Sequence, residues 1–547
     1  MSRKYLFWIV ACLAIATSAC ATLRPPPPRL DAAKACADWR WIGISQPGAQ
    51  CPEIKGWTVR PLFAQVAPAH QISEDFCPQE KNYCDAIKHE KVPSLEVIRE
   101  LNRFCVYEFA HKWGHPKVPP KSPELTRLDP DCAALSTSAG EDLDEGRLGT
   151  LSRRFLAQAG QETFKINNAN GVRLSFLDTE ETRGEMPKPD QPRLSLHGFT
   201  LANVGRNLVC QGEKCAARIT TRLALPFQKF DAKSRKLTKG KPGLGGYIGM
   251  QGDLAAAITD EVTAWQSARR PGSLEEHLVL NLSLAWDGEL FGGLDEGQIC
   301  EMRAGTQAIF RALQYAAGFD ALVLAAAGNQ KGEPCNNFGP LLPAAWEIGG
   351  PPEEDCDAAR KAPLVYAVAG VGGGSSPVVN ARDGGTPRRV AVGEGGVVAS
   401  LDPARHTAML TGSSVATSVV SSIAAVVWSS FPHLTSQQVM EILDGSGKEL
   451  LKDADFWFGA NDSPPTPRPK VHRVSLCKAL EAACGSPLNS AVIARVRCPL
   501  TAACADPESA DSPEDPASKF VPDSCQPWLH PQPEIPPCLS CGPPASR

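Results

Sequence analysis

The chain has 547 residues, enough for two or three folded units, each with a sizeable core. Its 56 basic and 60 acidic residues give a net charge of -4, and no long run of one sign occurs. Binding by charge alone requires a basic excess. Neither nucleic acid nor an anionic membrane surface is therefore an expected partner.

The first twenty residues have the layout of a secretory signal peptide. Arg3 and Lys4 precede an apolar segment that runs from Tyr5 to about Ala16, and small residues follow it. This segment is too short to span a membrane comfortably. We therefore expect export of the chain.

Residues 17–20, Thr-Ser-Ala-Cys, resemble a bacterial lipobox, although Thr17 stands where leucine is usual. The resemblance implies that Cys20 becomes lipidated and anchors the chain to a membrane; ordinary cleavage after Ala16 is the alternative. Ala21 is similar to the residue that follows the lipidated cysteine in outer-membrane lipoproteins. The expected location is the cell envelope, as an outer-membrane lipoprotein, and otherwise the periplasm or the exterior.

Cysteine content favours an oxidising compartment. Of the 20 cysteines, Cys12 and Cys20 lie in the leader, which leaves 20 − 2 = 18. An even number spread over the chain is typical of disulfides, whose connectivity the sequence does not give. Zinc is the alternative suggested by Cys538 and Cys541, but no second pair of ligands follows at finger spacing.

Composition divides the chain after the leader at 1–20. Residues 21–35 form a proline-rich linker of the stiff, extended type. Residues 36–150 combine cysteines with short amphipathic patterns, which predicts a small disulfide-stapled helical domain. Residues 151–450 alternate apolar runs of strand length with helical patterns, and this indicates an α/β fold around a parallel sheet. Residues 451–547 form a Cys/Pro-rich extension that we expect to be partly disordered.

Polar residues stand at the ends or the starts of four segments of the α/β region. Asp178 ends a candidate buried strand, at the sheet edge where such folds build their sites. His197 is followed by Gly198, which lets backbone or substrate pass close to the ring. Asn329 follows the strand-like run ALVLAAAG, and an amide there can donate to a developing oxyanion. Ser414 begins a long run of small and apolar residues.

Each of these signals is weak alone. A serine at a helix start is usually an N-cap, and His-Gly or Gly-Asn is usually part of a turn. Their order Asp, His, Ser, together with the matching strand and helix ends, resembles the signature blocks of the subtilisin-like serine proteases. The resemblance covers about residues 170–445.

The resemblance implies a subtilisin-like core, with a mostly parallel central sheet flanked by helices. It implies Asp178 as the orienting acid, His197 as the base and Ser414 as the nucleophile. Asn329, preceded by Gly328, falls on the oxyanion donor. The run LVLNLSLAW is similar to the strand that pairs with an extended substrate, which places Ser283, Leu284 and Ala285 along the cleft.

Several positions depart from the family pattern. Phe199 and Thr200 follow the His-Gly pair where Thr-His is usual, and Thr417 and Ser418 replace an Ala-Pro pair. The interval between Asp178 and His197, 197 − 178 = 19 positions, is short. The second histidine to consider as a base is His406, eight positions before Ser414 (414 − 406 = 8), but it lacks the glycine neighbour.

We therefore expect an envelope endopeptidase that cleaves a polypeptide substrate and needs no cofactor. No metal ligands are assigned; calcium is common in the family, but no ligand set here matches. The alternative is a catalytically inactive protein that keeps the fold for peptide binding or assembly. The resemblance also leaves open that residues 36–150 are an inhibitory propeptide, although their cysteines favour a permanent domain.

Overall fold

The computed structural model describes only part of the chain. The described residues are 36–66, 95–109, 118–135, 139–141, 145–160, 164–166, 171–179, 196–228, 230–231, 236–237, 247–268, 276–288, 293, 299–329, 340–349, 363–373, 375, 377–378, 381–382, 387–396, 398, 409–450, 470–485, 498–500 and 504.

The central element is an eight-stranded sheet in the order β19-β20-β17-β16-β15-β14-β6-β9. Its strands are β6 (Val172–Asp178), β9 (Ala217–Leu223), β14 (His277–Leu282), β15 (Leu322–Ala326), β16 (Tyr366–Val371), β17 (Arg389–Val392), β19 (Lys448–Glu449) and β20 (His472–Arg473). All neighbours pair in parallel except β19 and β20. This confirms the expected α/β fold with a mostly parallel sheet.

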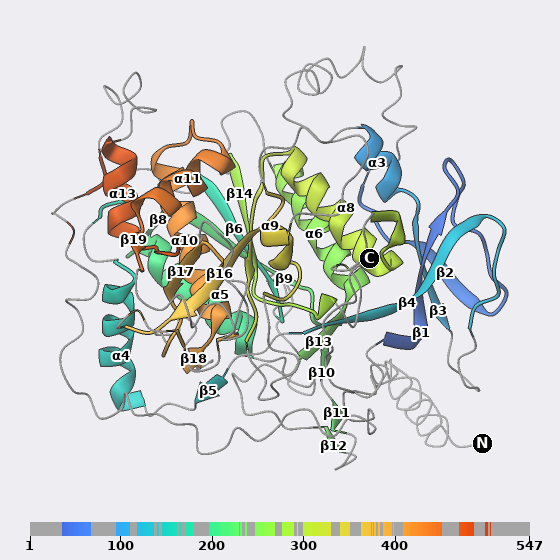
Figure 1. Ribbon diagram of the computed structural model, residues 1–547, viewed down its shortest axis with the longest axis horizontal. Coiled ribbons are helices and arrows are strands. Elements are labelled where there is room, and N and C mark those ends of the chain that lie inside the picture. The colour runs from blue at the N-terminus through green and yellow to red at the C-terminus, as the bar shows by residue number, and fades with distance from the viewer. Residues whose placement is uncertain are drawn as a thin grey trace, which may run out of the picture.

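Helices cover both faces of this sheet (Figure 1). The described helices are α3 (Leu95–Leu101), α4 (Glu145–Gln158), α5 (Leu196–Val209), α6 (Gln251–Ala268), η3 (Ile299–Glu301), α8 (Ala304–Gly318), α9 (Ala345–Gly349), α10 (Ser413–Ser430), α11 (Ser436–Ser446) and α13 (Leu476–Gly485), of which α5, α6, α8 and α10 pack on strands of this sheet. Side chains of each strand alternate between two cores. Leu278 and Leu280 of β14 join the core of α6 and α8, whereas Val279 joins that of α5 and α10.

A second sheet corrects the expectation of a helical N-terminal domain. It is antiparallel, with the order β10-β13-β4-β1-β3-β2. Its strands are β1 (Cys36–Ser45), β2 (Trp57–Pro61), β3 (Phe104–Phe109), β4 (Leu125–Leu135), β10 (Phe227–Gln228) and β13 (Tyr247–Met250). The remaining strands pair in twos: β5 (Ala139–Glu141) with β18 (Met409–Thr411), β7 (Cys210–Gln211) with β8 (Lys214–Cys215), and β11 (Phe230–Asp231) with β12 (Lys236–Leu237).

The helical prediction was wrong because one apolar pattern fits two structures. Val97, Ile98, Leu101 and Cys105 follow helical spacing, but α3 ends at Leu101 and β3 begins at Phe104. The FCVYEF run is rich in aromatic and β-branched residues, and its first four residues are buried, which hides a strand's alternation.

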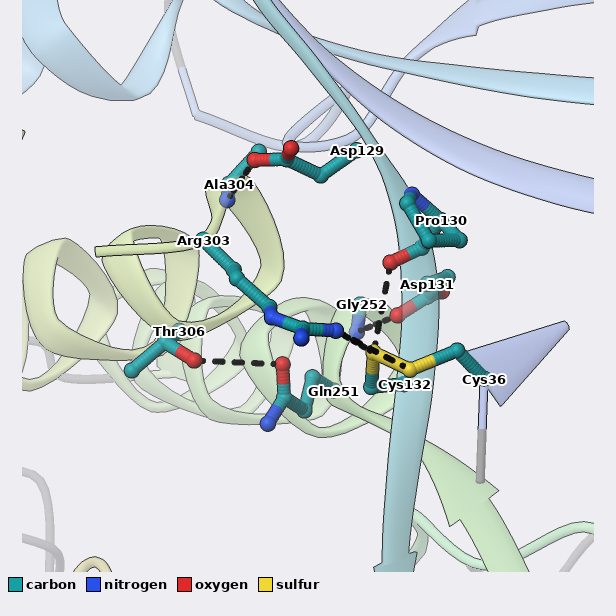
Figure 2. Close-up of a disulfide and its surroundings, with 10 residues drawn as sticks. All are labelled: Cys36, Asp129, Pro130, Asp131, Cys132, Gln251, Gly252, Arg303, Ala304 and Thr306. Carbon is teal, nitrogen blue, oxygen red and sulfur yellow. Dashed lines mark hydrogen bonds between the residues drawn. A yellow bond between two sulfur atoms is a disulfide. The ribbon is translucent and has the colours of Figure 1, made fainter. Parts of the chain in front are cut away.

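Five disulfides among the described residues agree with the expected oxidised cysteines: Cys36–Cys132, Cys51–Cys105, Cys210–Cys215, Cys477–Cys504 and Cys484–Cys498. Figure 2 shows the first of them, which joins β1 to β4. Arg303, the residue before α8, donates from Nη1 to both sulfur atoms at 3.3 Å. The start of α8 is therefore held against the N-terminal sheet.

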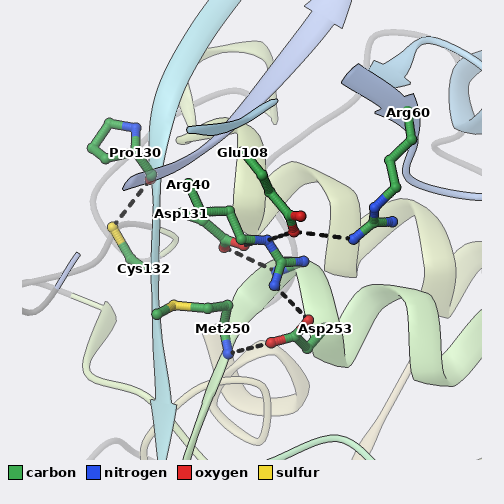
Figure 3. A network of polar contacts seen from close by, with 9 residues as sticks. Arg40, Arg60, Glu108, Pro130, Asp131, Cys132, Met250 and Asp253 are labelled. Carbon is green, nitrogen blue, oxygen red and sulfur yellow. Dashed lines mark hydrogen bonds and ion pairs between the residues drawn. The ribbon is translucent and has the colours of Figure 1, made fainter. Parts of the chain in front are cut away.

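A buried ion-pair network also joins this sheet to α6 (Figure 3). Arg40 of β1 lies 2.6 Å from Asp253 of α6 and 3.1 Å from Asp131 of β4. Asp131 also accepts a hydrogen bond from the backbone N–H of Gly252 at 3.0 Å. This ion-pair network and one shared hydrophobic core thus join the N-terminal strands to the region after residue 150.

Burial raises the pKa of Asp131 to about 7, although Arg40 acts in the opposite direction. As the pH rises, the unfolded chain releases the Asp131 proton at about pH 4, whereas the folded chain keeps it up to about pH 7. The contribution of Asp131 to the free energy of unfolding is greatest below about pH 4. This contribution falls by about 1.4 kcal/mol per pH unit as the pH rises to about 7, and it is constant above that pH.

We expect Asp131→Asn to remove this pH dependence. Between about pH 5 and 7 the Tm of the wild type should fall relative to that of the variant, as measured by differential scanning calorimetry. Asp129→Asn changes a partly exposed carboxylate on the same strand and serves as the control. A constant Tm difference between the wild type and Asp131→Asn would contradict the assignment.

Candidate active site

Asp178 is the last residue of β6, a strand inside the central sheet with β9 on one side and β14 on the other. Every residue of this strand is buried, and Asp178 has no exposed surface. Its Oδ1 accepts a hydrogen bond from the backbone N–H of Thr179 at 2.7 Å. The carboxylate therefore stands at the carboxyl end of a rigid strand, as the sequence predicts.

His197 lies in the first turn of α5 and faces Asp178. Its Nδ1 is 2.9 Å from Oδ1 and 3.0 Å from Oδ2 of the carboxylate. Because an ionised carboxylate only accepts hydrogen bonds, this contact places the proton of the neutral ring on Nδ1. Nε2 then carries a lone pair, as a general base requires.

The residues next to Asp178 and His197 in the chain hold these two side chains in place. Gly198 donates its backbone N–H to Oγ1 of Thr179 at 3.0 Å. The strand end after Asp178 and the helix start after His197 are therefore tied together directly. Thr179 acts as a positioning residue, and the Asp-Thr order in the sequence was the signal that could have identified it.

Ser414 lies in the first turn of α10, and 2% of its surface is exposed. Its hydroxyl donates to the backbone carbonyl of Ser283 at 3.4 Å, and the Ser283 hydroxyl donates to the Ser414 carbonyl at 3.1 Å. Asn281 in turn donates to the Ser283 hydroxyl at 2.9 Å. The end of β14 thus holds the start of α10.

One hydrogen bond sets α5 and α10 side by side in register. Ser418 Oγ donates to the carbonyl oxygen of Leu201 at 2.9 Å. Leu201 is one helical turn after His197, and Ser418 is one turn after Ser414. His197 and Ser414 are therefore each one helical turn before the residue of their helix that makes this contact.

Asn329 follows β15 and is held by Ser413, the residue before Ser414. Its Oδ1 accepts from the backbone N–H of Ser413 at 2.9 Å and from the Ser413 hydroxyl at 3.1 Å. With the amide oxygen used in this way, Nδ2 is the group that can donate to a reacting oxygen. Sequence reasoning missed Ser413, whose place beside Ser414 was the available signal.

Gly412 makes room for this amide. Its φ is +150°, and a Cβ there would lie 2.6 Å from Nδ2 of Asn329. Gly328 has a φ of +95°, and its N–H donates to Ser413 Oγ at 3.2 Å. Both glycines are required by the close approach of the two loops.

The predicted substrate-binding residues follow β14, whose end contacts Ser414, but their side chains are covered. Ser283, Leu284 and Ala285 are 1%, 2% and 6% exposed. The next residue, Trp286, exchanges two backbone hydrogen bonds with Leu342, at 2.9 and 3.0 Å. Contact of these residues with a peptide stays a prediction.

His277 lies at the opposite end of β14 from Ser283. His277 opens β14, stacks on Trp428 with ring centroids 4.3 Å apart, and contacts the carbonyl of Pro432 through Nε2 at 2.8 Å. These contacts give it a structural role. His406 lies outside the described residues.

Within the described parts of the chain, no group of three or more His, Cys, Asp or Glu side chains is arranged to hold a metal ion. Cys20 lies outside those parts. Of the described helices, α10 is long and apolar enough to cross a membrane, but 94% of that window is buried inside the protein, as in a core helix.

Comparison with known proteins matches residues 277–455 to the model of the subtilase family. No curated protein matches the chain. Among solved structures, the prenylagaramide maturation protease PagA is 18% identical, with 61% of this chain and 98% of that chain covered and a TM-score of 0.36. The patellamide maturation protease PatA is 21% identical, with 58% and 99% covered and a TM-score of 0.35.

The family match includes Ser283, Asn329 and Ser414, whereas Asp178 and His197 precede it. Those two residues reach the site through β6 and α5, the elements that pack beside the matched region. The chain therefore contains a subtilase family domain, matched over residues 277–455.

Proposed function

We propose that this chain is a serine endopeptidase that hydrolyses peptide bonds through an acyl-enzyme on Ser414. The observation that carries the proposal is the buried contact of His197 with Asp178, set by the α5–α10 hydrogen bond beside the start of α10. A serine hydroxyl is a poor nucleophile until a base takes its proton. Asp178 at a strand end, and His197 and Ser414 at two helix starts, supply the acid, base and hydroxyl that this activation needs.

In the proposed reaction, His197 Nε2 takes the proton of Ser414 as its oxygen attacks the carbonyl carbon. Asp178 holds the tautomer and stabilises the imidazolium that forms. The proton then passes to the leaving amine, and water releases the acyl group in a second step with His197 again acting as base.

The oxyanion would be bound by Asn329 Nδ2 and by the backbone N–H of Ser414. The start of α10 adds the positive end of its helix dipole. The amide of Asn329 is preorganised by Ser413, so its donor does not need to reorient during the reaction.

The proposed substrate is an extended polypeptide bound as an added strand beside Ser283, Leu284 and Ala285. The five disulfides support an exported protein. Anchoring to the envelope through a lipid on Cys20 belongs to the same proposal and rests on the lipobox-like sequence.

One observation favours the alternative of an inactive, peptide-binding protein with the same fold. His197 has no exposed surface and Ser414 has 2%, so the site is closed in this structure. An active enzyme must open this site to its substrate, whereas a scaffold need not.

Labelling by a fluorophosphonate serine-hydrolase probe distinguishes the two functions. We expect the oxidised wild type to be labelled and both Ser414→Ala and His197→Ala to be unlabelled, because the probe needs an activated hydroxyl. Ser430→Ala, at the far end of α10, is the control. A folded wild type that stays unlabelled, also after limited proteolysis, would support the scaffold instead.

Replacement of Asn329 tests the oxyanion donor. Asn329→Ala should lower kcat for a peptide substrate by about 10² to 10³, with a small change in KM, because the donor acts on the transition state. Asn102→Ala, near the N-terminal sheet, should leave kcat unchanged. An Asn329→Ala enzyme with the kcat of the wild type would exclude this role.

Gly412→Ala tests the same site through the backbone. The added methyl group would displace Asn329 Nδ2 and strain a φ of +150°. We expect kcat to fall about tenfold or more while the folded state persists, because only one donor moves. Gly445→Ala, in α11, has nothing within 4 Å of its new methyl group and is the matched control.

A further inference from the structure

An arginine side chain contacts the disulfide between Cys36 and Cys132 (Figure 2). Nη1 of Arg303 lies 3.3 Å from each of the two sulfur atoms. In the part of the chain that the structure describes, these sulfur atoms alone accept hydrogen bonds from the Arg303 side chain, and no carboxylate lies within ion-pair distance of it. A disulfide is neutral, so the positive charge of this partly buried guanidinium is left without an anion.

A second disulfide of the N-terminal sheet has the same burial but no such contact. Cys105 of β3 has no exposed surface and its partner Cys51 is partly exposed, as are Cys132 and Cys36 respectively. Among the described residues, no cationic side chain donates to the sulfur atoms of this disulfide. Arg303 therefore distinguishes Cys36–Cys132 from a disulfide in a matching environment.

Reduction of this disulfide supplies the anion that Arg303 lacks. A cysteine next to an arginine is stabilised as the thiolate relative to the neutral thiol. Cys132 has no exposed surface, and the attraction between two charges is stronger where water is excluded. The guanidinium thus stabilises the reduced form of the pair and does little for the oxidised form.

Two carboxylates of β4 lie near the disulfide, but both have other partners (Figure 2). Asp129 forms an ion pair with Arg127 at 2.5 Å. Asp131 lies 3.1 Å from Arg40, and burial raises the pKa of Asp131 to about 7, so part of it is uncharged at neutral pH. Neither carboxylate is paired with Arg303, which therefore can pair with a sulfur anion.

We propose that Cys36–Cys132 is a thiol–disulfide exchange site, which a dithiol reduces reversibly within the folded protein. The proposal goes beyond the peptidase function and does not depend on the role of Ser414. One thiolate of the dithiol attacks Sγ of Cys36, the partly exposed sulfur, and the S–S bond breaks. Cys132 leaves as a thiolate beside Arg303.

The second thiol of the dithiol completes the exchange. Its proton passes to the sulfur of Cys36 as its own sulfur attacks the mixed disulfide, and the bond to Cys36 breaks. The dithiol has then lost two electrons and become a disulfide, whereas Cys36 is a thiol and Cys132 a thiolate. An oxidised dithiol reverses the same steps.

The fold does not depend on this one covalent link. After reduction, β1 still pairs with β4 and with β3. Arg40 still lies 2.6 Å from Asp253 of α6, and the core shared with α6 and α8 is unchanged. Arg303 keeps a sulfur partner, so the start of α8 stays against the sheet. The site can therefore cycle between two redox states without unfolding.

The test titrates the oxidised full-length chain with mixtures of reduced and oxidised dithiothreitol. Thiols are trapped with N-ethylmaleimide and assigned by peptide mass spectrometry, and gel filtration checks that the chain stays folded. Cys36–Cys132 should be half reduced at a ratio of reduced to oxidised dithiothreitol about tenfold lower than Cys51–Cys105, because Arg303 stabilises its reduced form. Equal midpoints, or a lower midpoint for Cys51–Cys105, would overturn the proposal.

Variants of Arg303 isolate the effect of its charge. Arg303→Gln should raise the midpoint of Cys36–Cys132 about tenfold, whereas Arg303→Lys keeps a cation and should stay closer to the wild type. Arg311→Gln, about two turns further along α8, is the matched control and should change neither midpoint. An unchanged midpoint in a folded Arg303→Gln chain would show that the guanidinium does not stabilise the reduced pair. The comparison of the two disulfides in the wild type decides the proposal even if this variant fails to fold.

Discussion

The close packing of α10 against the central sheet and against α5 is the constraint on which the site depends. Gly205 of α5 passes so near β6 that a Cβ would lie 2.5 Å from the ring of Phe176. With α5 packed this closely, Ser418 Oγ of α10 donates to the carbonyl of Leu201 at 2.9 Å. A larger residue at Gly205 would lift α5 from the sheet and carry His197 away from both partners.

The same packing creates a demand for polar partners inside the core. α10 carries hydroxyl groups on a helix that is buried almost throughout, and each buried hydroxyl needs a partner. Ser422 and Thr417 donate to carbonyls one turn earlier, whereas Ser421 donates to Asn281 at 3.1 Å. Asn281 continues through Ser283 to the Ser414 carbonyl. The hydrogen bonds that satisfy the buried hydroxyls of α10 thus also fix its first turn, which contains Ser414.

Sequence reasoning predicted the site better than it predicted the N-terminal half of the fold. Asp178, His197, Asn329 and Ser414 each follow a local rule, because the end of a strand or the start of a helix is visible in neighbouring residues. β1 and β4 have no such local signal, because their paired residues lie 60 to 117 positions apart, from Ile44 with Phe104 (104 − 44 = 60) to Ala133 with Met250 (250 − 133 = 117). This sheet consists of such distant pairs and includes β13, which lies after residue 240. Residue spacing in the sequence therefore does not predict it.

Exposure of Ser414 depends on which of the surrounding elements can move. Ser414 is 2% exposed, so a peptide can reach its hydroxyl only if a covering element moves. The sheet of β1 and β4 is a poor candidate for that movement, because Arg40 and Asp131 would lose buried partners at a high cost in desolvation. β5 is held by a two-stranded pairing, and a strand pair this short has little stability alone. The sheet of β1 and β4 therefore remains packed against α6 and α8, as part of one hydrophobic core.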